Sequence, residues 1–423
     1  MGNRTIPLSL VLCVWLAACG APAAERPSPV PNTASASPSV TSSPWRASTV
    51  PTPAASATPS SFSPSAVGAK ELAIRWRAGD LTGLGAVASI IGVARSGDRY
   101  VLAGELPYRD EGSSEAAAWW SGDGRSWELA QEFPAGQRIL TLTAGGPGFV
   151  AAGFEDEGAA VWTSIDGREW HPVSDASLGH GVIHQLVATT SGLVGFGRRS
   201  DSEEPAIYTS PDGYQWLAAT NETGLSVARG LHAVGAYDGR AVAYASQGDD
   251  KPDAIWETTG RAEWTRTGEL REIATVDLVA GGPRGWLALG ENRAWTSRDG
   301  RAWSMGVPGP DVAADAIVDD SGFIAVGWVG SRPGETCGDQ RPFAGHTWTS
   351  SDGRTWKRMP VTREFKSAMV TRLLIVDRTL IGFGLRPGAA DAMPIGRWTA
   401  RLPDTSRPAN RSDKASVFKG CGG

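Results

Sequence analysis

A nine-residue motif that recurs along the chain constrains the fold more than any other feature. It begins and ends with an aromatic residue, holds an Asp-Gly pair at its fifth and sixth positions, and occurs at residues 119–127, 162–170, 208–216, 295–303 and 348–356. A sixth copy at 256–264 keeps both tryptophans but carries Gly260 in place of the aspartate. The closing tryptophans follow one another at intervals of 39 to 53 residues. Such a period is typical of architectures built from repeated supersecondary units.

Each motif is preceded by a short glycine-flanked apolar stretch, such as 148–153 or 322–327, and by a further apolar run. One period therefore predicts three or four short strands separated by glycine-rich turns. Four strands in about 45 residues correspond to one blade of a β-propeller. We predict an all-β fold, a seven-bladed β-propeller with four-stranded blades. The glycine-flanked strand occurs seven times, beginning near Tyr100, Phe149, Leu193, Ala241, Trp286, Phe323 and Leu380.

The seventh repeat lacks a fourth strand, because the chain continues from Trp398 into Leu402 and Pro403 without a second motif tryptophan. At the other end, Trp76 in the stretch 72–77 stands where the second tryptophan of a motif would stand. An open ring would leave sheet edges and blade faces unburied. We therefore expect this N-terminal strand to pair beside residues 395–402 and to close the ring.

The Asp-Gly pair predicts a hairpin between the third and fourth strands, as a type I′ turn with positive φ at both residues. The aspartate and the preceding serine can accept backbone N–H bonds inside the turn, and the flanking tryptophans can pack between sheets. We expect structural roles, not metal or acid chemistry, for the repeated residues. They are Asp123, Asp166, Asp212, Asp299, Asp352, Trp127, Trp170, Trp216, Trp264, Trp303 and Trp356.

The motif resembles the Asp-box, or BNR repeat, of sialidase-like propellers and of many exported bacterial propellers. The resemblance covers about residues 70 to 402. It differs in that the familiar box separates its Asp and Gly by one residue. In this family, sialidases use an arginine cluster, a Tyr nucleophile and an Asp acid/base. The sequence has no Phe-Arg-Ile-Pro segment, and Tyr108 with Arg109 is the remaining weak match. We therefore predict no catalytic residues.

The first 18 residues are expected to be a lipoprotein signal peptide. Arg4 precedes an uncharged, mostly apolar stretch from Ile6 to Ala18, which as a helix rises about 20 Å and is too short for the ~30 Å hydrocarbon layer. The ending Leu16-Ala17-Ala18-Cys19 resembles a bacterial lipobox. That resemblance implies cleavage before Cys19, lipid on its sulfur, and an extracytoplasmic protein anchored to the bacterial cell membrane. A soluble secreted protein is the alternative.

Residues 19–67 are rich in Pro, Ser, Ala and Thr and are predicted to form a disordered, lipid-anchored linker. The propeller is expected to span 68–402, followed by a C-terminal tail, 403–423. Cys337 and Cys421 remain after the leader and the lipidated cysteine are set aside. A pair of cysteines in an exported protein predicts a disulfide, with two free thiols as the alternative.

The formal charge of −5 gives no electrostatic footprint for nucleic acid. His180 and His184 lie where a loop enters an expected strand, so no metal site is predicted, and no cofactor is expected. Loops between the second and third strands are rich in acids, either because they are simply solvated or because they recruit a cation, a basic protein or an amino sugar. The candidate binding face comprises Glu155, Asp156, Glu157, Asp201, Glu203, Glu204, Asp249 and Asp250, with Tyr108 and Arg109.

We expect an extracytoplasmic, lipid-anchored binding or scaffolding module that acts as a monomer and whose ligand the sequence does not identify. A glycan and a basic protein are the partners considered. A sialidase-like glycoside hydrolase and an assembly factor for an envelope complex are the alternative functions.

Overall fold

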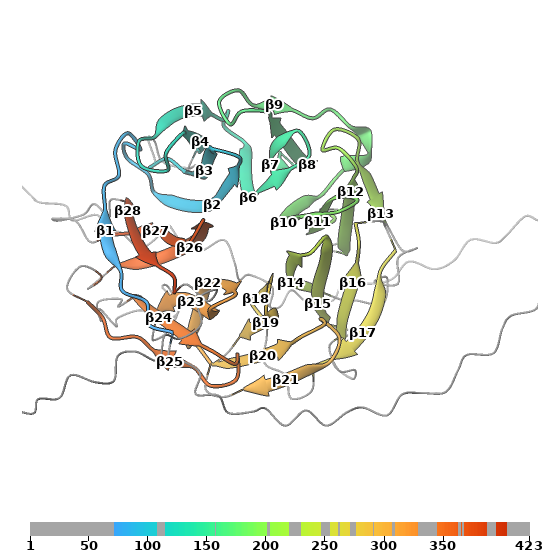
Figure 1. The fold of residues 1–423 in the computed structure, drawn as a ribbon. Coiled ribbons are helices and arrows are strands. Elements are labelled where there is room, and N and C mark those ends of the chain that lie inside the picture. Colours follow the sequence, from blue (N-terminus) through green and yellow to red (C-terminus); the bar gives the residue numbers. More distant parts are fainter. Residues whose placement is uncertain are drawn as a thin grey trace, which may run out of the picture. The chain divides into compact units, whose positions relative to one another are not determined.

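The computed structural model describes residues 72–107, 115–156, 158–200, 204–219, 230–246, 254–260, 263–270, 276–290, 292–306, 309–328, 345–362, 365, 368–386 and 395–403. These residues form seven four-stranded antiparallel sheets that follow one another around a ring (Figure 1). The predicted seven-bladed propeller is therefore confirmed.

The first four blades each contain four consecutive strands. Blade 1 is β2 (Ser89–Ser96), β3 (Arg99–Glu105), β4 (Ala116–Ser121) and β5 (Glu128–Glu132). Blade 2 is β6 (Gln137–Gly145), β7 (Gly148–Glu155), β8 (Gly158–Ser164) and β9 (His171–Pro172), and a 3₁₀ turn, η1 (Ala176–Leu178), follows it. Blade 3 is β10 (Val182–Thr189), β11 (Gly192–Arg198), β12 (Pro205–Ser210) and β13 (Leu217–Ala219). Blade 4 is β14 (Gly230–Tyr237), β15 (Arg240–Ser246), β16 (Ala254–Thr258) and β17 (Thr265–Glu269).

The last three blades complete the ring, and the seventh takes its outer strand from the N-terminal side. Blade 5 is β18 (Leu278–Gly282), β19 (Gly285–Gly290), β20 (Arg293–Ser297) and β21 (Trp303–Gly306). Blade 6 is β22 (Val312–Asp319), β23 (Gly322–Trp328), β24 (Gly345–Ser350) and β25 (Lys357–Arg358). Blade 7 is β26 (Met369–Val376), β27 (Thr379–Leu385), β28 (Ile395–Arg401) and β1 (Arg77–Gly79).

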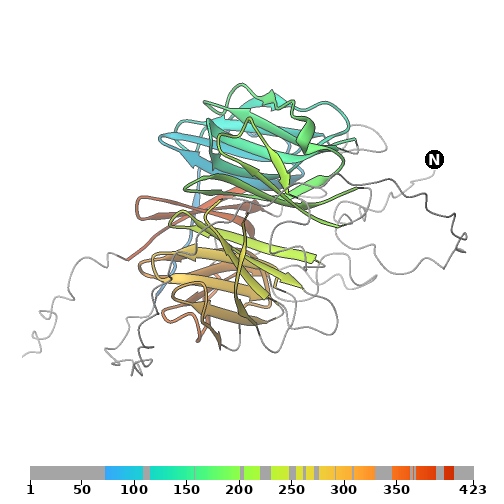
Figure 2. The same cartoon turned by 90° about the vertical axis from the view of Figure 1, so that its right-hand side faces the viewer.

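The first strand of each blade lies nearest the ring axis, and the fourth lies outermost (Figure 1); Figure 2 shows the same blades from the side. The hydrophobic core is divided into clusters that lie between neighbouring blades. One cluster joins Tyr100 and Leu102 of blade 1 to Phe383 of blade 7. Another joins Trp398 of blade 7 to Ile324 of blade 6. Each blade therefore buries its faces against its two neighbours, which is why seven weakly stable sheets form one stable ring.

Ring closure occurs as expected from the missing fourth strand. β1 pairs antiparallel with β28, and Ala78 lies opposite Trp398. Trp76 directly precedes β1, as Trp127 precedes β5, so its assignment as a second motif tryptophan is confirmed. The strand itself starts one residue after Trp76, whereas the sequence placed it at 72–77.

Residues 72–82, here called the closing segment, join three blades. The Thr349 hydroxyl of β24 donates to the Leu72 carbonyl (2.9 Å), which attaches the segment to blade 6. After β1 has paired with blade 7, the Thr82 amide donates to the Arg125 carbonyl of blade 1 (3.0 Å). The closing segment therefore ties blades 6, 7 and 1 together, and Figure 1 shows it running from β24 past β1 toward blade 1.

Candidate functional site

The Asp-Gly turns share one set of hydrogen bonds, seen in blade 2. The Gly167 amide donates to the Ser164 hydroxyl (2.8 Å). The Arg168 and Glu169 amides donate to Asp166 Oδ1 at 2.8 and 3.3 Å. These side chains are therefore occupied by backbone donors. The same bonds hold the turns of Asp123, Asp212, Asp299 and Asp352.

The backbone of these turns differs from the expected type I′ conformation. The five glycines have φ between 67° and 88°, but none of the five aspartates has positive φ. In blade 1 the strand pairing ends at Trp120 and Glu128, so residues 121–127 form a wider loop. The type I′ pattern occurs instead at Asp238-Gly239, where φ is 50° and 72°. The expectation was wrong because the serine and aspartate side chains capture N–H groups that strand pairing would have used.

Replacing Asp166 with alanine is expected to lower the free energy of unfolding by about 1–2 kcal/mol, since two amides lose their acceptor. The N–H of Arg168 lowers the pKa of Asp166 below its ordinary value of 3.8. A lowered pKa means that this contribution is complete above pH ~4 and is lost as the pH falls through the folded-state value. Urea unfolding at pH 7 and pH 3 measures both effects, with the exposed Ile165→Ala as control. Equal midpoints for Asp166→Ala and the unmodified protein at pH 7 would contradict the role.

The strands that line the axis share an irregularity that sequence reasoning missed. Six of the seven inner strands contain a β-bulge at their third or fourth residue. The residue after the bulge is polar in four blades, although its neighbours are largely apolar. We call the six residues that directly follow a bulge, polar or not, the post-bulge residues. They are Gly92, Thr141, Gln185, Ala233, Asp315 and Arg372.

Each of the four polar post-bulge residues connects its own blade to the next one along the chain or, for Arg372, around the ring. Three act as acceptors for an amide on the following inner strand: Leu186 donates to Thr141 (3.1 Å), Val234 to Gln185 (2.9 Å) and Leu373 to Asp315 (2.7 Å). The fourth, Arg372, donates from Nε to the Ile91 carbonyl (2.6 Å) and so joins blade 7 to blade 1. These polar groups near the axis therefore bind neighbouring backbone.

Asp315 and Arg372 belong to adjacent inner strands and influence each other electrostatically. Burial raises the pKa of Asp315, although Arg372 and the amides of Leu373 and Ala316 oppose the shift. Burial lowers the pKa of Arg372, and the Asp315 carboxylate opposes that shift. The two side chains compensate each other's charge while each is held by backbone groups. They are suited to fixing the ring rather than to exchanging protons with a ligand.

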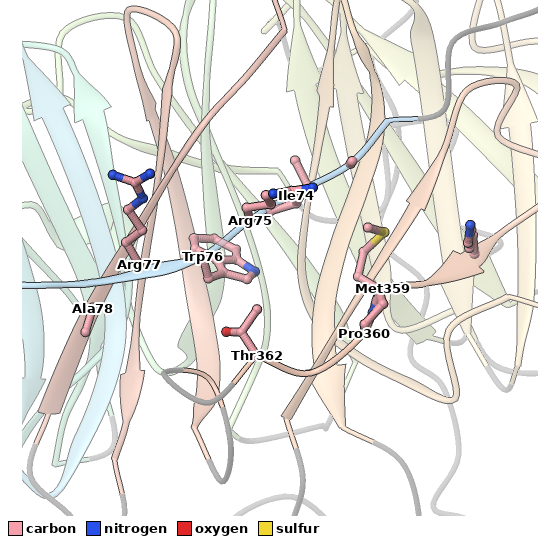
Figure 3. Close-up of a pocket in the computed structure, with 10 residues that line it drawn as sticks. Ile74, Arg75, Trp76, Arg77, Ala78, Met359, Pro360 and Thr362 are labelled. Atoms are coloured by element: carbon pink, nitrogen blue, oxygen red, sulfur yellow. The ribbon is translucent and has the colours of Figure 1, made fainter.

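A pocket of about 840 Å³ lies where the closing segment passes the loop after β25 (Figure 3). We call it the closing pocket. Trp76 and Ile74 of its wall are buried, whereas its basic side chains are exposed. None of its lining residues is acidic. They are residues 73–78 together with Lys357, Met359, Pro360 and Thr362, so the basic groups are Arg75, Arg77 and Lys357.

One hydrogen bond and one ring stack hold Trp76 in the wall of the closing pocket. The Trp76 indole N–H donates to the Thr347 hydroxyl (2.7 Å), and its ring stacks on Phe365 at 5.6 Å between centroids. Among the described residues, the Thr362 hydroxyl has no hydrogen-bond partner, and its oxygen is enclosed by protein. In Figure 3 the Thr362 side chain lies next to that of Trp76, and Met359 and Pro360 lie across from both. The pocket thus combines an apolar wall with exposed cations.

The acidic candidate binding face is described only in part. The Glu155 carboxylate accepts a hydrogen bond from Gln137 (2.7 Å), and Asp156 is exposed with a φ of 51°. Glu204 is also exposed. The remaining predicted residues lie outside the described residues: Tyr108, Arg109, Glu157, Asp201, Glu203, Asp249, Asp250, Cys19, Cys337 and Cys421. Both the acidic face and the disulfide therefore stay predictions.

Within the described ranges, no group of His, Cys, Asp and Glu side chains could hold a metal ion. The same ranges contain no helix with the length and apolarity that a bilayer crossing requires.

Comparisons with known proteins give structural likeness only. No family model matches the chain, and no curated protein matches it. The endosialidase of phage phi92 is similar with a TM-score of 0.40 and 11% identity, over 83% of this chain and 71% of that one. A Trypanosoma rangeli sialidase in complex with the inhibitor DANA is similar with a TM-score of 0.42 and 13% identity, over 75% of this chain and 55% of that one. An exo-β-1,3-galactanase from Clostridium thermocellum is similar with a TM-score of 0.34 and 12% identity, over 77% of this chain and 99% of that one. Values this low carry no argument about activity.

Proposed function

We propose that this protein is an extracytoplasmic propeller that binds an acidic glycan of the cell envelope in the closing pocket, and that it catalyses no reaction. The observation that carries the proposal is the charge of the pocket wall. Arg75, Arg77 and Lys357 are exposed around it, and no lining residue is acidic. An anionic ligand gains attraction there, whereas a basic protein would be repelled.

The chemistry of the wall suits a sugar carboxylate better than a bare ion. Ligand sites combine apolar surface with a few placed polar groups. Met359 and Pro360 offer apolar surface to a sugar ring. The basic side chains supply the contact to the carboxylate, since charge-assisted hydrogen bonds are roughly twice as strong as neutral ones.

The proposal includes the location expected from the N-terminus. The lipobox-like ending at Cys19 supports lipid anchoring, and the Pro- and Ser-rich linker would let the propeller reach the surrounding wall. A glycan of the cell wall or surface layer would then lie within range of the pocket.

Binding is tested by titrating the full chain with an acidic oligosaccharide and with its carboxyl-reduced, neutral counterpart in calorimetry. We expect saturable binding of the acidic form only, and weaker binding as salt rises. The double substitution Arg75→Gln, Lys357→Gln should weaken binding by roughly tenfold or more. Arg298→Gln is the matched control, since Arg298 is an exposed arginine of blade 5 outside the pocket. Equal binding of both sugars, or an unaffected double variant, refutes the proposal.

The sialidase-like hydrolase is the second reading. It rests on the motif resemblance, and its weak catalytic match, Tyr108 with Arg109, lies outside the described residues. Release of sugar from a sialylated substrate, lost on Tyr108→Phe, would favour it over binding alone. No residue of the described part of the chain supports the alternative function as an envelope assembly factor.

A further inference from the structure

The seam between blades 7 and 1 contains a charged residue at a position that other blades fill with uncharged residues. The position is the one before the first motif aromatic on the third strand. In blade 7 it is Arg397, whose exposed fraction is only 5%. The counterparts in blades 1 to 6 are Ala118, Val161, Ile207, Ile255, Ala294 and Thr347.

Arg397 is buried without a partner. Among the described residues it makes no hydrogen bond and no ion pair, and its Nε is fully enclosed. Its guanidinium lies against β1, since a Cβ added to Gly79 would fall 2.6 Å from Arg397 Nη1. A buried cation with unused N–H donors costs free energy unless an anion or water satisfies it.

The charged groups that act on Arg397 are one guanidinium, Arg125, and two carboxylates, Asp123 and Asp80. Burial lowers the pKa of Arg397 and Arg125 lowers it further, whereas Asp123, Tyr100 and Asp80 raise it. The Asp123 carboxylate already accepts the amide of Arg125 at 2.7 Å and one further amide of its own turn.

A third arginine faces the same seam. The Arg95 guanidinium lies 5.6 Å from the centre of the Tyr100 ring, and within the described part of the chain its buried Nε has no hydrogen-bond partner. Tyr100 belongs to the cluster that joins blade 1 to blade 7. The unused donors of Arg95 and Arg397 thus belong to one interface.

At the seam between blades 4 and 5, a carboxylate pairs with the arginines. Glu257 of β16 accepts from Arg240 at 3.0 Å and from Arg301 at 3.2 Å. Arg301 stands in the Asp-Gly turn of blade 5 as Arg125 stands in that of blade 1. The counterpart of Glu257 in blade 7, directly after the first motif aromatic, is Thr399. The carboxylate that neutralises one seam is therefore missing from the other.

We propose that the seam between blades 7 and 1 binds a small oxyanion, such as phosphate, sulfate or a free carboxylate, in the role that Glu257 plays between blades 4 and 5. The anion would accept from Arg397 and Arg95, and it would stabilise the contact of β1 with β28. This site is separate from the closing pocket and does not depend on the glycan proposal.

The test compares thermal midpoints of the full chain in phosphate, sulfate, acetate and chloride at equal ionic strength. We expect a saturable rise of roughly 2 °C with at least one oxyanion at millimolar concentration and none with chloride. Thr399→Glu, which supplies the missing carboxylate, should raise the midpoint without anion and abolish the response. Arg397→Met should also abolish it.

Thr209→Glu is the matched control, because Thr209 follows the first motif aromatic of blade 3 as Thr399 does in blade 7. It should leave the response intact. The proposal is overturned if Thr399→Glu responds like the unmodified protein, or if no oxyanion differs from chloride. Should Arg397→Met not fold, Thr399→Glu still decides the outcome.

Discussion

Replacing Trp76 with alanine is expected to lower the free energy of unfolding by about 3–5 kcal/mol, the range for truncating a large buried aromatic side chain. Trp76 is 4% exposed, stacks on Phe365 and donates to Thr347. Its loss would open a cavity between blades 6 and 7 and release the closing segment. Chemical unfolding followed by circular dichroism measures the change.

Two controls separate the causes of the Trp76→Ala effect. Thr347→Val removes only the hydrogen-bond acceptor and should cost about 1 kcal/mol. Leu217→Ala truncates a side chain that is 55% exposed and should change stability by less than about 0.5 kcal/mol. A Trp76→Ala cost no larger than that of Leu217→Ala would show that the closing segment does not hold the ring.

Replacing Arg372 with methionine is expected to cost about 3 kcal/mol at pH 7, because the Ile91 carbonyl loses its donor and the Asp315 carboxylate loses its compensating charge. Burial already raises the pKa of Asp315, so the folded protein without Arg372 favours the protonated carboxyl still more. A raised folded-state pKa gives stability that is present at low pH and is lost as the pH rises through that value.

The penalty of Arg372→Met should therefore be smaller at pH 4 than at pH 7. The Asp-Gly turns contribute the opposite pH dependence, but they do so equally in both proteins and cancel in the difference. Arg298→Met, an exposed arginine of blade 5, should show neither effect. A penalty that is the same at both pH values would exclude the proposed coupling to Asp315.

The blade number and the closure could be predicted because they follow from a long-period repeat. The aromatic pairs and glycine-flanked strands mark each sheet, and the missing fourth strand after Trp398 requires a replacement. The turn conformation could not be predicted from Asp-Gly alone. Side-chain acceptors at Ser164 and Asp166 compete with strand pairing, and the outcome depends on hydrogen bonds that a dipeptide preference does not include.

The four polar post-bulge residues could have been found from the sequence. Thr141, Gln185, Asp315 and Arg372 each stand in the first strand of a repeat, among mainly apolar residues. Aligning these strands would have placed the four at one position. The closing pocket and the unpaired Arg397 could not be found this way, because both arise where residues from opposite ends of the chain meet.

Disulfide trapping of Arg77→Cys with Thr399→Cys tests ring closure most directly. These residues lie opposite each other in the β1 and β28 pairing, and opposed residues in antiparallel strands are about 4.5–5.5 Å apart between Cα atoms, within reach of a disulfide. After mild oxidation, mass spectrometry should identify a peptide that links position 77 to position 399, and Arg77→Cys with Thr209→Cys should give no link. Failure to link 77 with 399, or a link to 209 instead, would contradict the closed seven-bladed ring.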